Sequence, residues 1–240
     1  ILSPVNSYAG SMQVIAAGAN EIYCAVGIPG AEHLLNRPQT CCLGSYDELE
    51  AVAKHAHANG VRVVVTLELP FIAEFMAAQM QAHIESCVRA GADALIVGDI
   101  GLILMVREMG LDLPIHASTL MGSMNHEAVR FLTSLGVARV ILERHVTIAE
   151  IDEIVQKCPD VEIEVFIHGG GCSNINANCY LTGQVRMPED ALRQLMSEIE
   201  GMVKPCRYPY DIYECVSGKI GEKLTRAPVL DAFSYCSLCD

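Results

Sequence analysis

Residues 161–180, VEIEVFIHGGGCSNINANCY, combine the residue types best suited to chemistry in this chain. An alternating apolar run of β-forming residues ends at His168, and three glycines then lead to Cys172 and Cys179. Glycine lets the backbone approach a bulky group closely, which a cofactor-binding loop requires. The stretch therefore predicts a strand followed by a ligand-binding loop. The alternative is a glycine-rich turn beside two incidental buried thiols.

The whole chain contains eleven cysteines, including Cys172 and Cys179. The first residues lack the pattern of a signal peptide, so the thiols are expected to stay reduced in a cytoplasmic protein. Three cysteines fall inside strand or helix patterns and are expected to pack in the core: Cys24, Cys87 and Cys158. The cysteines of the later loops are Cys172, Cys179, Cys206 and one of Cys236 or Cys239.

Four loop thiolates from separate segments can bind either a tetrahedral Zn²⁺ ion or a [4Fe–4S] cluster. Structural zinc sites usually take their ligands in close CxxC pairs, and Cys236 and Cys239 form the single pair of this kind. An iron–sulfur cluster accepts scattered cysteines more readily. A [4Fe–4S] cluster is therefore the favoured cofactor, with zinc as the alternative.

A weak repeat organises the first 170 residues or so. Glycines suited to a left-handed helix end precede apolar runs that fit strands buried on both faces. These glycines are Gly18, Gly60, Gly91 and Gly136. Amphipathic helical segments alternate with the runs at residues 11–17, 46–58, 73–89, 126–134 and 147–157. About seven β-α units predict an α/β fold with a parallel sheet, a TIM-barrel-like fold that closes or nearly closes. An open, doubly wound sheet is the alternative.

The repeat stops after residue 181, where the composition changes. Residues 1–185 are predicted to form the barrel-like domain. Residues 186–240 are predicted to form a helix and a short cysteine-rich C-terminal extension, packed on the barrel mouth within the same domain.

Polar side chains at the predicted strand ends are candidates for the reaction, because parallel barrels gather their reactive groups at the carboxyl ends of the strands. The predicted catalytic residues are His168, His116, Glu68 and Asp99. The predicted substrate-binding residues are Asn6, Arg37, Ser118, Asn125, Glu143 and Arg144. Helix capping is the alternative for Asp99, and a hydrogen bond to a backbone group is the alternative for both histidines.

An anionic small molecule is expected at the mouth against Arg144, with Arg37 as the competing cation near that rim. Arg37 is the single cation of the long loop at residues 28–45, and Arg144 follows a predicted strand. A guanidinium recognises a carboxylate bidentately, so a small anionic or aromatic substrate is expected there. The alternative for Arg144 is an ion pair with Glu143 or a neighbouring acid.

The composition restricts the partners. The net charge is −13 and the 16 Lys and Arg residues are scattered, whereas a phosphate backbone requires clustered positive charge. Direct nucleic-acid binding is therefore disfavoured. No uninterrupted apolar run reaches the roughly 18 residues of a membrane span, so a membrane span is not expected.

Several segments resemble the peptidase U32 family, also known as collagenase-like proteases. The resemblance rests on SPVNSYAGSMQVIAAGANEIYCAVG, IHASTLMGSMN, ERHVTIAEI, EVFIHGGGCSNINANCYLT and KPCRYPY. Two departures are present: NANC stands where the family usually has SGRC, and the NRG-x-C element upstream of the QPCR-like segment is missing.

The resemblance implies an oxygen-independent hydroxylation protein with a [4Fe–4S] cluster and prephenate as the hydroxyl donor. It implies cluster ligands at Cys172, Cys179, Cys206 and Cys239, with Cys236 as the alternative to Cys239. Members of the family act on tRNA or rRNA bases or on ubiquinone precursors. Because of the acidic composition, we expect hydroxylation of a small aromatic or isoprenoid-like substrate.

Other functions stay open. The chain could be a cluster-bearing partner in a homo- or hetero-oligomer with another U32 protein, a hydroxylase of RNA bases, or a metal-dependent peptidase. Proteolysis has no support in the residues, because no spaced nucleophile and base stand out and HEXXH is absent. An enzyme of the hydroxylase type is favoured.

Overall fold

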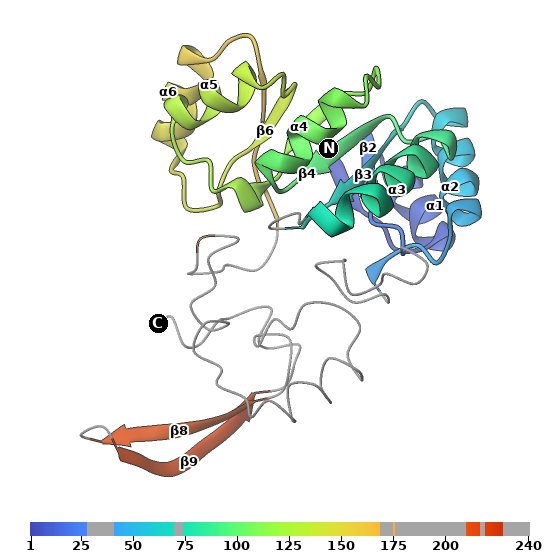
Figure 1. Cartoon of the computed structure of the whole chain (residues 1–240). Coiled ribbons are helices and arrows are strands. Elements are labelled where there is room, and N and C mark those ends of the chain that lie inside the picture. The colour runs from blue at the N-terminus through green and yellow to red at the C-terminus, as the bar shows by residue number, and fades with distance from the viewer. Residues whose placement is uncertain (28–40, 70–73, 169–174, 176–209, 217–218, 228–240) are drawn as a thin grey trace.

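Seven parallel strands form one curled sheet in the computed structural model, which describes residues 1–27, 41–69, 74–168, 175, 210–216 and 219–227. Each strand pairs in parallel with the next along the chain (Figure 1). The strands are β1 (Leu2–Pro4), β2 (Glu21–Cys24), β3 (Arg62–Leu67), β4 (Ala94–Val97), β5 (Ile115–Ala117), β6 (Arg139–Ile141) and β7 (Glu162–Glu164). A doubly wound sheet places its first strands in the middle, so the sequential order excludes that alternative and confirms the barrel-like prediction.

Helices of the described residues cover the outer side of this sheet (Figure 1). They are α1 (Tyr8–Ala16), α2 (Tyr46–Ala58), α3 (Ala77–Arg89), α4 (Ile100–Glu108), α5 (His126–Ser134) and α6 (Ile148–Lys157), with the short 3₁₀ turns η3 (Glu74–Met76) and η4 (Thr119–Met121). None of these helices has the length and apolar character needed to cross a membrane.

Local signals in the chain explain where the helices begin and end. The N-cap side chains of α1, α2 and α6 are Ser7, Ser45 and Thr147, and each accepts a hydrogen bond from a backbone N–H of the first turn. The four glycines predicted at helix ends all have positive φ, and Gly110 adds a fifth after α4. The predicted helix at residues 11–17 begins earlier, at Tyr8, because Ser7 supplies the cap.

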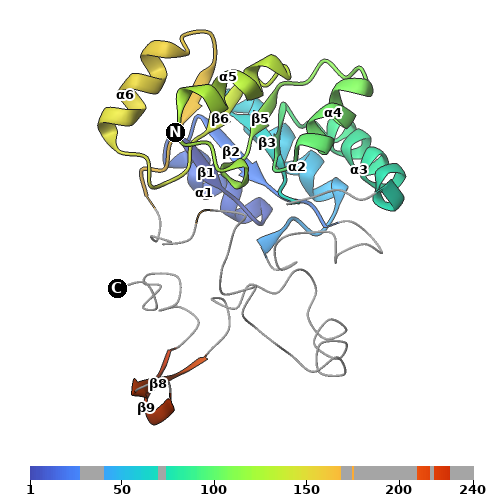
Figure 2. The ribbon, with the colours of Figure 1, turned by 60° about the vertical axis from the view of Figure 1, so that its left-hand side comes forward.

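The curl of the sheet brings distant strands together. Arg139, the first residue of β6, donates a hydrogen bond from Nη1 to Oε2 of Glu21, the first residue of β2, at 2.6 Å. Four strand positions separate these residues in the sheet, and Figure 2 shows the strands gathered inside the ring of helices. Among the described strands, β1 and β7 do not pair with each other, so these seven form a curled half-barrel.

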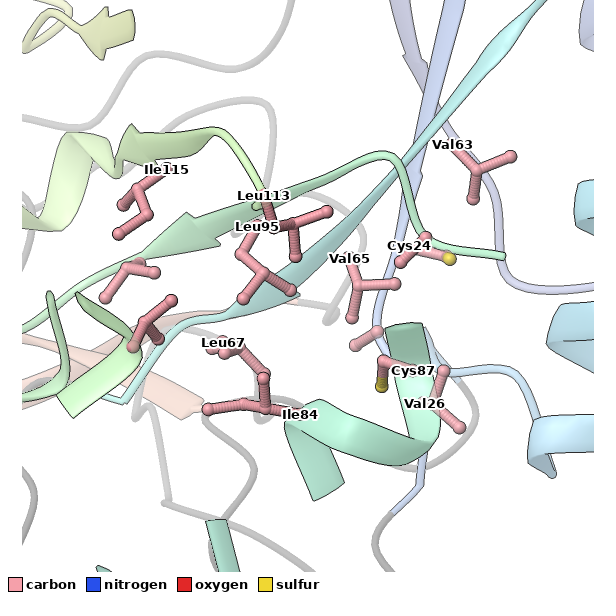
Figure 3. Packing of buried hydrophobic residues seen from close by; sticks show 14 of the residues in the cluster. Cys24, Val26, Val63, Val65, Leu67, Ile84, Cys87, Leu95, Leu113 and Ile115 are labelled. Carbon is pink, nitrogen blue, oxygen red and sulfur yellow. The ribbon is translucent and has the colours of Figure 1, made fainter. Parts of the chain in front are cut away.

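Most apolar side chains pack between the sheet and the helices. Figure 3 shows Val65 of β3 near Cys87 of α3, and Leu67 of β3 near Ile84 of α3. Cys24, Cys87 and Cys158 are buried free thiols, which confirms their prediction as packing residues.

A smaller apolar cluster lies on the opposite face of the sheet, inside the barrel. It contains Val64, Ala94, Ile96 and Ile141.

Strands β8 (Tyr210–Val216) and β9 (Lys219–Ala227) form a separate antiparallel pair. The sequence analysis did not predict this hairpin, although the dipeptide SG at residues 217–218 is a turn signal. The helix predicted after residue 186, and the packing of the extension on the barrel mouth, lie outside the described residues.

Candidate functional site

Parallel pairing places the carboxyl ends of β1 to β7 on one rim. Asn6, Glu68, Asp99 and Glu143 follow β1, β3, β4 and β6 within a few residues, and His168 lies beyond β7. Glu68 is half-buried, whereas Asn6 and His168 are exposed. The fold therefore brings these predicted residues to one end of the sheet, as expected for a barrel mouth. Their roles in a reaction stay predictions.

Three of the predicted residues act as caps at this rim. Asp99 Oδ1 accepts a hydrogen bond from the Leu102 N–H at 2.9 Å, and Asn125 Oδ1 accepts one from the Ala128 N–H at 2.9 Å. Ser118 Oγ accepts from the Leu120 N–H at 3.2 Å. Each cap fixes the start of a helical turn directly beside the mouth.

Glu143 forms a carboxylate–imidazole pair with His145. Its side chain is buried, and Oε2 lies 2.6 Å from His145 Nδ1 while also accepting the His145 N–H at 3.0 Å. A buried carboxylate fixes the orientation and tautomer of an imidazole, so the half-exposed His145 ring is held at the rim. The sequence places His145 among the polar residues after this strand, together with Glu143 and Arg144, but no role was predicted for it.

Arg144 lies at the same rim with its guanidinium over an aromatic ring. The guanidinium carbon is 4.8 Å from the ring centroid of Phe166, which follows β7. This cation–π contact holds the guanidinium over the ring at the rim. This geometry suits the predicted recognition of a carboxylate.

His116 lies deeper than the rim, inside the barrel on β5. It is 2% exposed, and burial, with a smaller effect of the Arg139 charge, lowers its pKa from 6.5 to about 4. Its ring is therefore neutral near pH 7. Its Nδ1 atom is buried and has no hydrogen-bond partner among the residues that the structure describes. No backbone group of the described residues forms a hydrogen bond with Nδ1, which was the structural alternative for this histidine.

The proposed cluster ligands Cys172, Cys179, Cys206, Cys236 and Cys239, as well as Arg37, lie outside the described residues. In the described part, no group of three or more His, Cys, Asp or Glu side chains could hold a metal ion. Ile175, between Cys172 and Cys179, is described. A Cβ atom added to Gly122 would lie 3.5 Å from Ile175 Cγ2, which places Ile175 against the turn after η4.

The sequential parallel strands and the polar rim define a barrel protein with its candidate site at the carboxyl ends of the strands. Residues 6–231 match the model of peptidase family U32, and the chain belongs to this family. The resemblance inferred from the sequence segments is thereby confirmed.

Curated relatives with similar sequences include proteins of RNA hydroxylation. The tRNA hydroxylation protein P of Escherichia coli (strain K12) is 30% identical over 224 residues, which cover 92% of this chain and 46% of the relative. The 23S rRNA 5-hydroxycytidine C2501 synthase of the same organism is 29% identical over 217 residues, which cover 88% and 30%.

A third relative carries a different name. The collagenase of Porphyromonas gingivalis (strain ATCC BAA-308 / W83) is 28% identical over 192 residues, which cover 76% of this chain and 44% of the relative. The chain thus spans about half the length, or less, of these relatives.

Solved structures support the fold. The U32 peptidase Mk0906 aligns with a TM-score of 0.55 at 17% identity, covering 68% of this chain and 66% of that chain. A 2,3-dimethylmalate lyase aligns with a TM-score of 0.50 at 14% identity, covering 85% of both chains. These likenesses concern the barrel architecture alone.

The names of the relatives conflict with one expectation. The scattered cations predicted that nucleic acid is a disfavoured partner, yet two similar proteins are named for tRNA and rRNA. Net charge describes the long-range field of a whole chain and does not exclude contact with a single base in a barrel mouth.

Proposed function

We propose that this chain forms the barrel of a U32-type enzyme that hydroxylates a base of tRNA or rRNA in the cytoplasm. The observation that carries the proposal is the 30% identity to a tRNA hydroxylation protein over 92% of the chain. The proposal replaces a small aromatic or isoprenoid-like substrate with an RNA base, which was an alternative in the sequence analysis.

The charges of the barrel restrict how RNA binds. Arg139 is engaged in ion pairs inside the barrel, and the half-exposed Arg62 pairs with the same Glu21 carboxylate, so both guanidinium groups already have an acidic partner. The described barrel therefore contacts a base, and phosphate contacts are supplied from elsewhere, including an oligomer with a second U32 protein. Such a mode predicts a shallower salt dependence for the barrel than for a typical RNA-binding domain.

We propose a [4Fe–4S] cluster as the cofactor, bound by Cys172, Cys179, Cys206 and Cys239, with Cys236 as the alternative to Cys239. Support comes from the four thiols themselves and from Ile175, which lies beside the turn at Gly122 near the barrel mouth. When bound, such a cluster supplies one-electron redox chemistry.

The remaining rim residues have proposed roles toward the substrates. The guanidinium of Arg144, stacked on Phe166, binds a carboxylate of the hydroxyl donor, for which prephenate is the proposed compound. The imidazole of His168 is exposed at the rim and moves a proton at the reacting group. Glu143 keeps His145 oriented beside Arg144.

The test is expression of the chain in a bacterial strain that lacks its own tRNA hydroxylation protein. Nucleosides from digested tRNA and rRNA are then analysed by mass spectrometry. We expect a nucleoside with one additional oxygen atom, and its loss in the Cys172→Ser variant. Restored hydroxylation of a ubiquinone precursor, with unmodified RNA, would instead support the small-molecule substrate.

Three further measurements separate the remaining alternatives. Anaerobic reconstitution followed by iron, sulfide and zinc analysis tests the cofactor, and Cys172→Ser should lose most of the iron; full retention of iron contradicts the ligand assignment. A peptide-cleavage assay on the reconstituted protein tests the peptidase alternative that the collagenase relative raises. Activity that appears only with a second U32 protein identifies the chain as a partner subunit.

A further inference from the structure

A network of ion pairs lies in the barrel interior at the amino-terminal ends of the strands. Arg139 lies 2.6 Å from carboxylate oxygens of both Glu21 and Glu162 and 3.1 Å from Glu164. Arg62 also pairs with Glu21. Four of these residues are the first residues of β2, β3, β6 and β7, so the network fills the end of the barrel opposite the mouth. Its guanidinium groups are engaged by carboxylates and do not recruit a further anion.

Thr66 and His116 also face the barrel interior, and His116 is the register partner of Arg139 at the edge of this network. The chain neighbours of each, Val65 and Leu67 for Thr66 and Ile115 and Ala117 for His116, belong to the core between sheet and helices. Successive side chains of a strand point to opposite faces, so Thr66 and His116 lie on the inner face.

The strand register places Thr66 and His116 in one layer of the interior. Thr66 is paired with Ile96, and Ile96 is paired with His116. One strand separates them, about 10 Å between Cα atoms, so a single ring can contact both side chains.

Both residues carry a buried polar atom that has no hydrogen-bond partner in the described part of the chain. These atoms are Thr66 Oγ1 and His116 Nδ1, and both residues are 2% exposed. A buried polar group without a partner is costly, and native proteins seldom keep one. Two such atoms in one register row, beside Arg139 of the ionic network, indicate a position for a hydrogen-bonding ligand.

The hydrogen-bonding groups of Thr66 and His116 are uncharged, and the neighbouring Arg139 cation is paired with acids. The buried His116 imidazole is uncharged near pH 7, so it offers one N–H donor and one lone pair, and the Thr66 hydroxyl offers both as well. Apolar side chains of Val64, Ile96 and Ile141 share the same interior face. Such a surface suits an uncharged flat ring with donors and acceptors at its edge. A phosphate or carboxylate group would find no cation there that is not already paired with an acid.

We propose that Thr66 and His116 form a subsite that binds the hydrogen-bonding edge of an uncharged planar ring. Resting on the proposed function, the ring is the target base of the RNA substrate. The subsite separates two binding tasks: the base lies deep in the barrel, and the anionic donor lies at the rim near Arg144. The ligand class rests on the described residues alone and is independent of the cluster.

The discriminating variant is Thr66→Val, which replaces the hydroxyl with a methyl group of similar size. Removing a buried hydroxyl that lacks a partner should leave the protein as resistant to urea as the wild type, or more so. The same change should weaken the binding of a ring that uses the hydroxyl, by about 3- to 10-fold. A structural role alone does not produce this combination of unchanged or raised stability and lost affinity.

The measurement is a titration of the ¹⁵N-labelled histidine signals of the full chain with cytidine, uridine, adenosine and guanosine. We expect at least one nucleoside to shift the His116 imidazole signals, and Thr66→Val to raise its Kd. The matched control is Thr133→Val on α5, because the Thr133 hydroxyl donates to the Val129 carbonyl at 2.8 Å outside the barrel. This control should leave nucleoside affinity unchanged.

Two results would overturn the subsite. One is a loss of stability in Thr66→Val, which would show that the hydroxyl is already satisfied. The other is the absence of a specific nucleoside effect. In that case the His116 signals either shift with no nucleoside or shift equally with acetate and phosphate, which are added as anion controls.

The outcome is separable from that of the proposed function. If RNA is hydroxylated but no nucleoside shifts the His116 signals, the subsite is refuted and the proposed function is not. If a nucleoside shifts the His116 signals but RNA is not hydroxylated, the proposed reaction is refuted and the subsite is not.

Discussion

Two buried histidines show how one residue type meets different needs in this protein. His83 on α3 lies in the core, where its Nδ1 is 2.7 Å from the Tyr46 hydroxyl and its Nε2 is 3.8 Å from Cys87 Sγ. His116 lies in the barrel interior with Nδ1 unsatisfied by the described residues. Burial is the main cause that lowers the pKa of both to about 4. The first is structural, and the second is available to a ligand.

This burial predicts a loss of stability in mild acid. In the unfolded chain both histidines take up protons near pH 6.5, whereas the folded protein resists protonation until about pH 4. The free energy of unfolding should therefore fall as the pH falls through this window, by up to about 1.4 kcal/mol per pH unit for each histidine. Glu164 opposes this trend, because burial raises its pKa and favours its protonated form in the folded state.

Urea unfolding at several pH values between 6.5 and 4 measures the effect. His83→Gln should reduce the slope by about half, since one of two titrating groups is removed. The control is His55→Gln, at a half-buried ring near the surface that lies edge-on to Tyr8. A wild-type stability that is constant across the window contradicts the neutral state of His116 on which the subsite depends.

At the level of elements, the rim residues serve the helices as well as the site. In a β-α repeat, the carboxyl end of each strand leads directly to the N-terminus of a helix, so a polar residue there can cap the helix, face the mouth, or do both. Asp99 caps α4 and Asn125 caps α5, whereas α6 begins with a capping box of Thr147 and Glu150. The capping alternative for Asp99 therefore has direct geometric support.

A pair of substitutions separates the two roles of Asp99. Asp99→Ala should lower the free energy of unfolding by about 1 kcal/mol, and Asp99→Ser should restore it, because serine is also a good N-cap. Thr147→Ala, at an exposed cap of α6, is the control for a cap without a catalytic proposal. Urea unfolding measures stability, and RNA hydroxylation by the stable Asp99→Ser variant decides the role. Full activity would make Asp99 a cap only, whereas loss of activity supports catalysis.

At the level of the whole molecule, the buried ionic network holds the curl of the half-barrel. The Arg139 guanidinium on β6 contacts Glu21 on β2 and Glu162 on β7, and both it and Glu21 are about nine-tenths buried. Burial opposes ionisation of Glu21, but the hydrogen bond to Arg139 together with the positive charges of Arg139 and Arg62 outweighs this and lowers the pKa of the carboxyl group. The network joins strands that the described backbone pairing leaves apart.

Breaking this network should destabilise the barrel strongly. Arg139→Met leaves buried carboxylates without their cation and should cost about 3 to 5 kcal/mol in the free energy of unfolding. The double variant Arg139→Met/Glu21→Gln should recover part of that loss, because the two residues interact directly. The control is Arg130→Met, which breaks an exposed pair with Glu127 and should cost well under about 1 kcal/mol. Equal losses in the two single variants would show that the interior pairs do not hold the curl.

The sequence by itself determined the local elements of this protein. Glycine after a helix is a short-range signal, and it marked the ends of α2 and α3 at Gly60 and Gly91 with little error, whereas the start of α1 at Tyr8 was placed three residues too late. The alternation of such helices with apolar runs was enough to predict the parallel barrel, because few other folds connect strands in this way. The segments that resemble the U32 family were also recognisable from the sequence alone.

Only the tertiary structure decided which side chains meet. Arg139 and Glu21 are 118 residues apart and touch because the sheet curls. Thr66 in RVVVTL has the appearance of one more β-former among apolar neighbours. Parallel strands buried on both faces have no alternation of polar and apolar residues, so the sequence does not mark which face is inside. The inner face is set by the curl and the register, and these placed Thr66 and His116 in one layer.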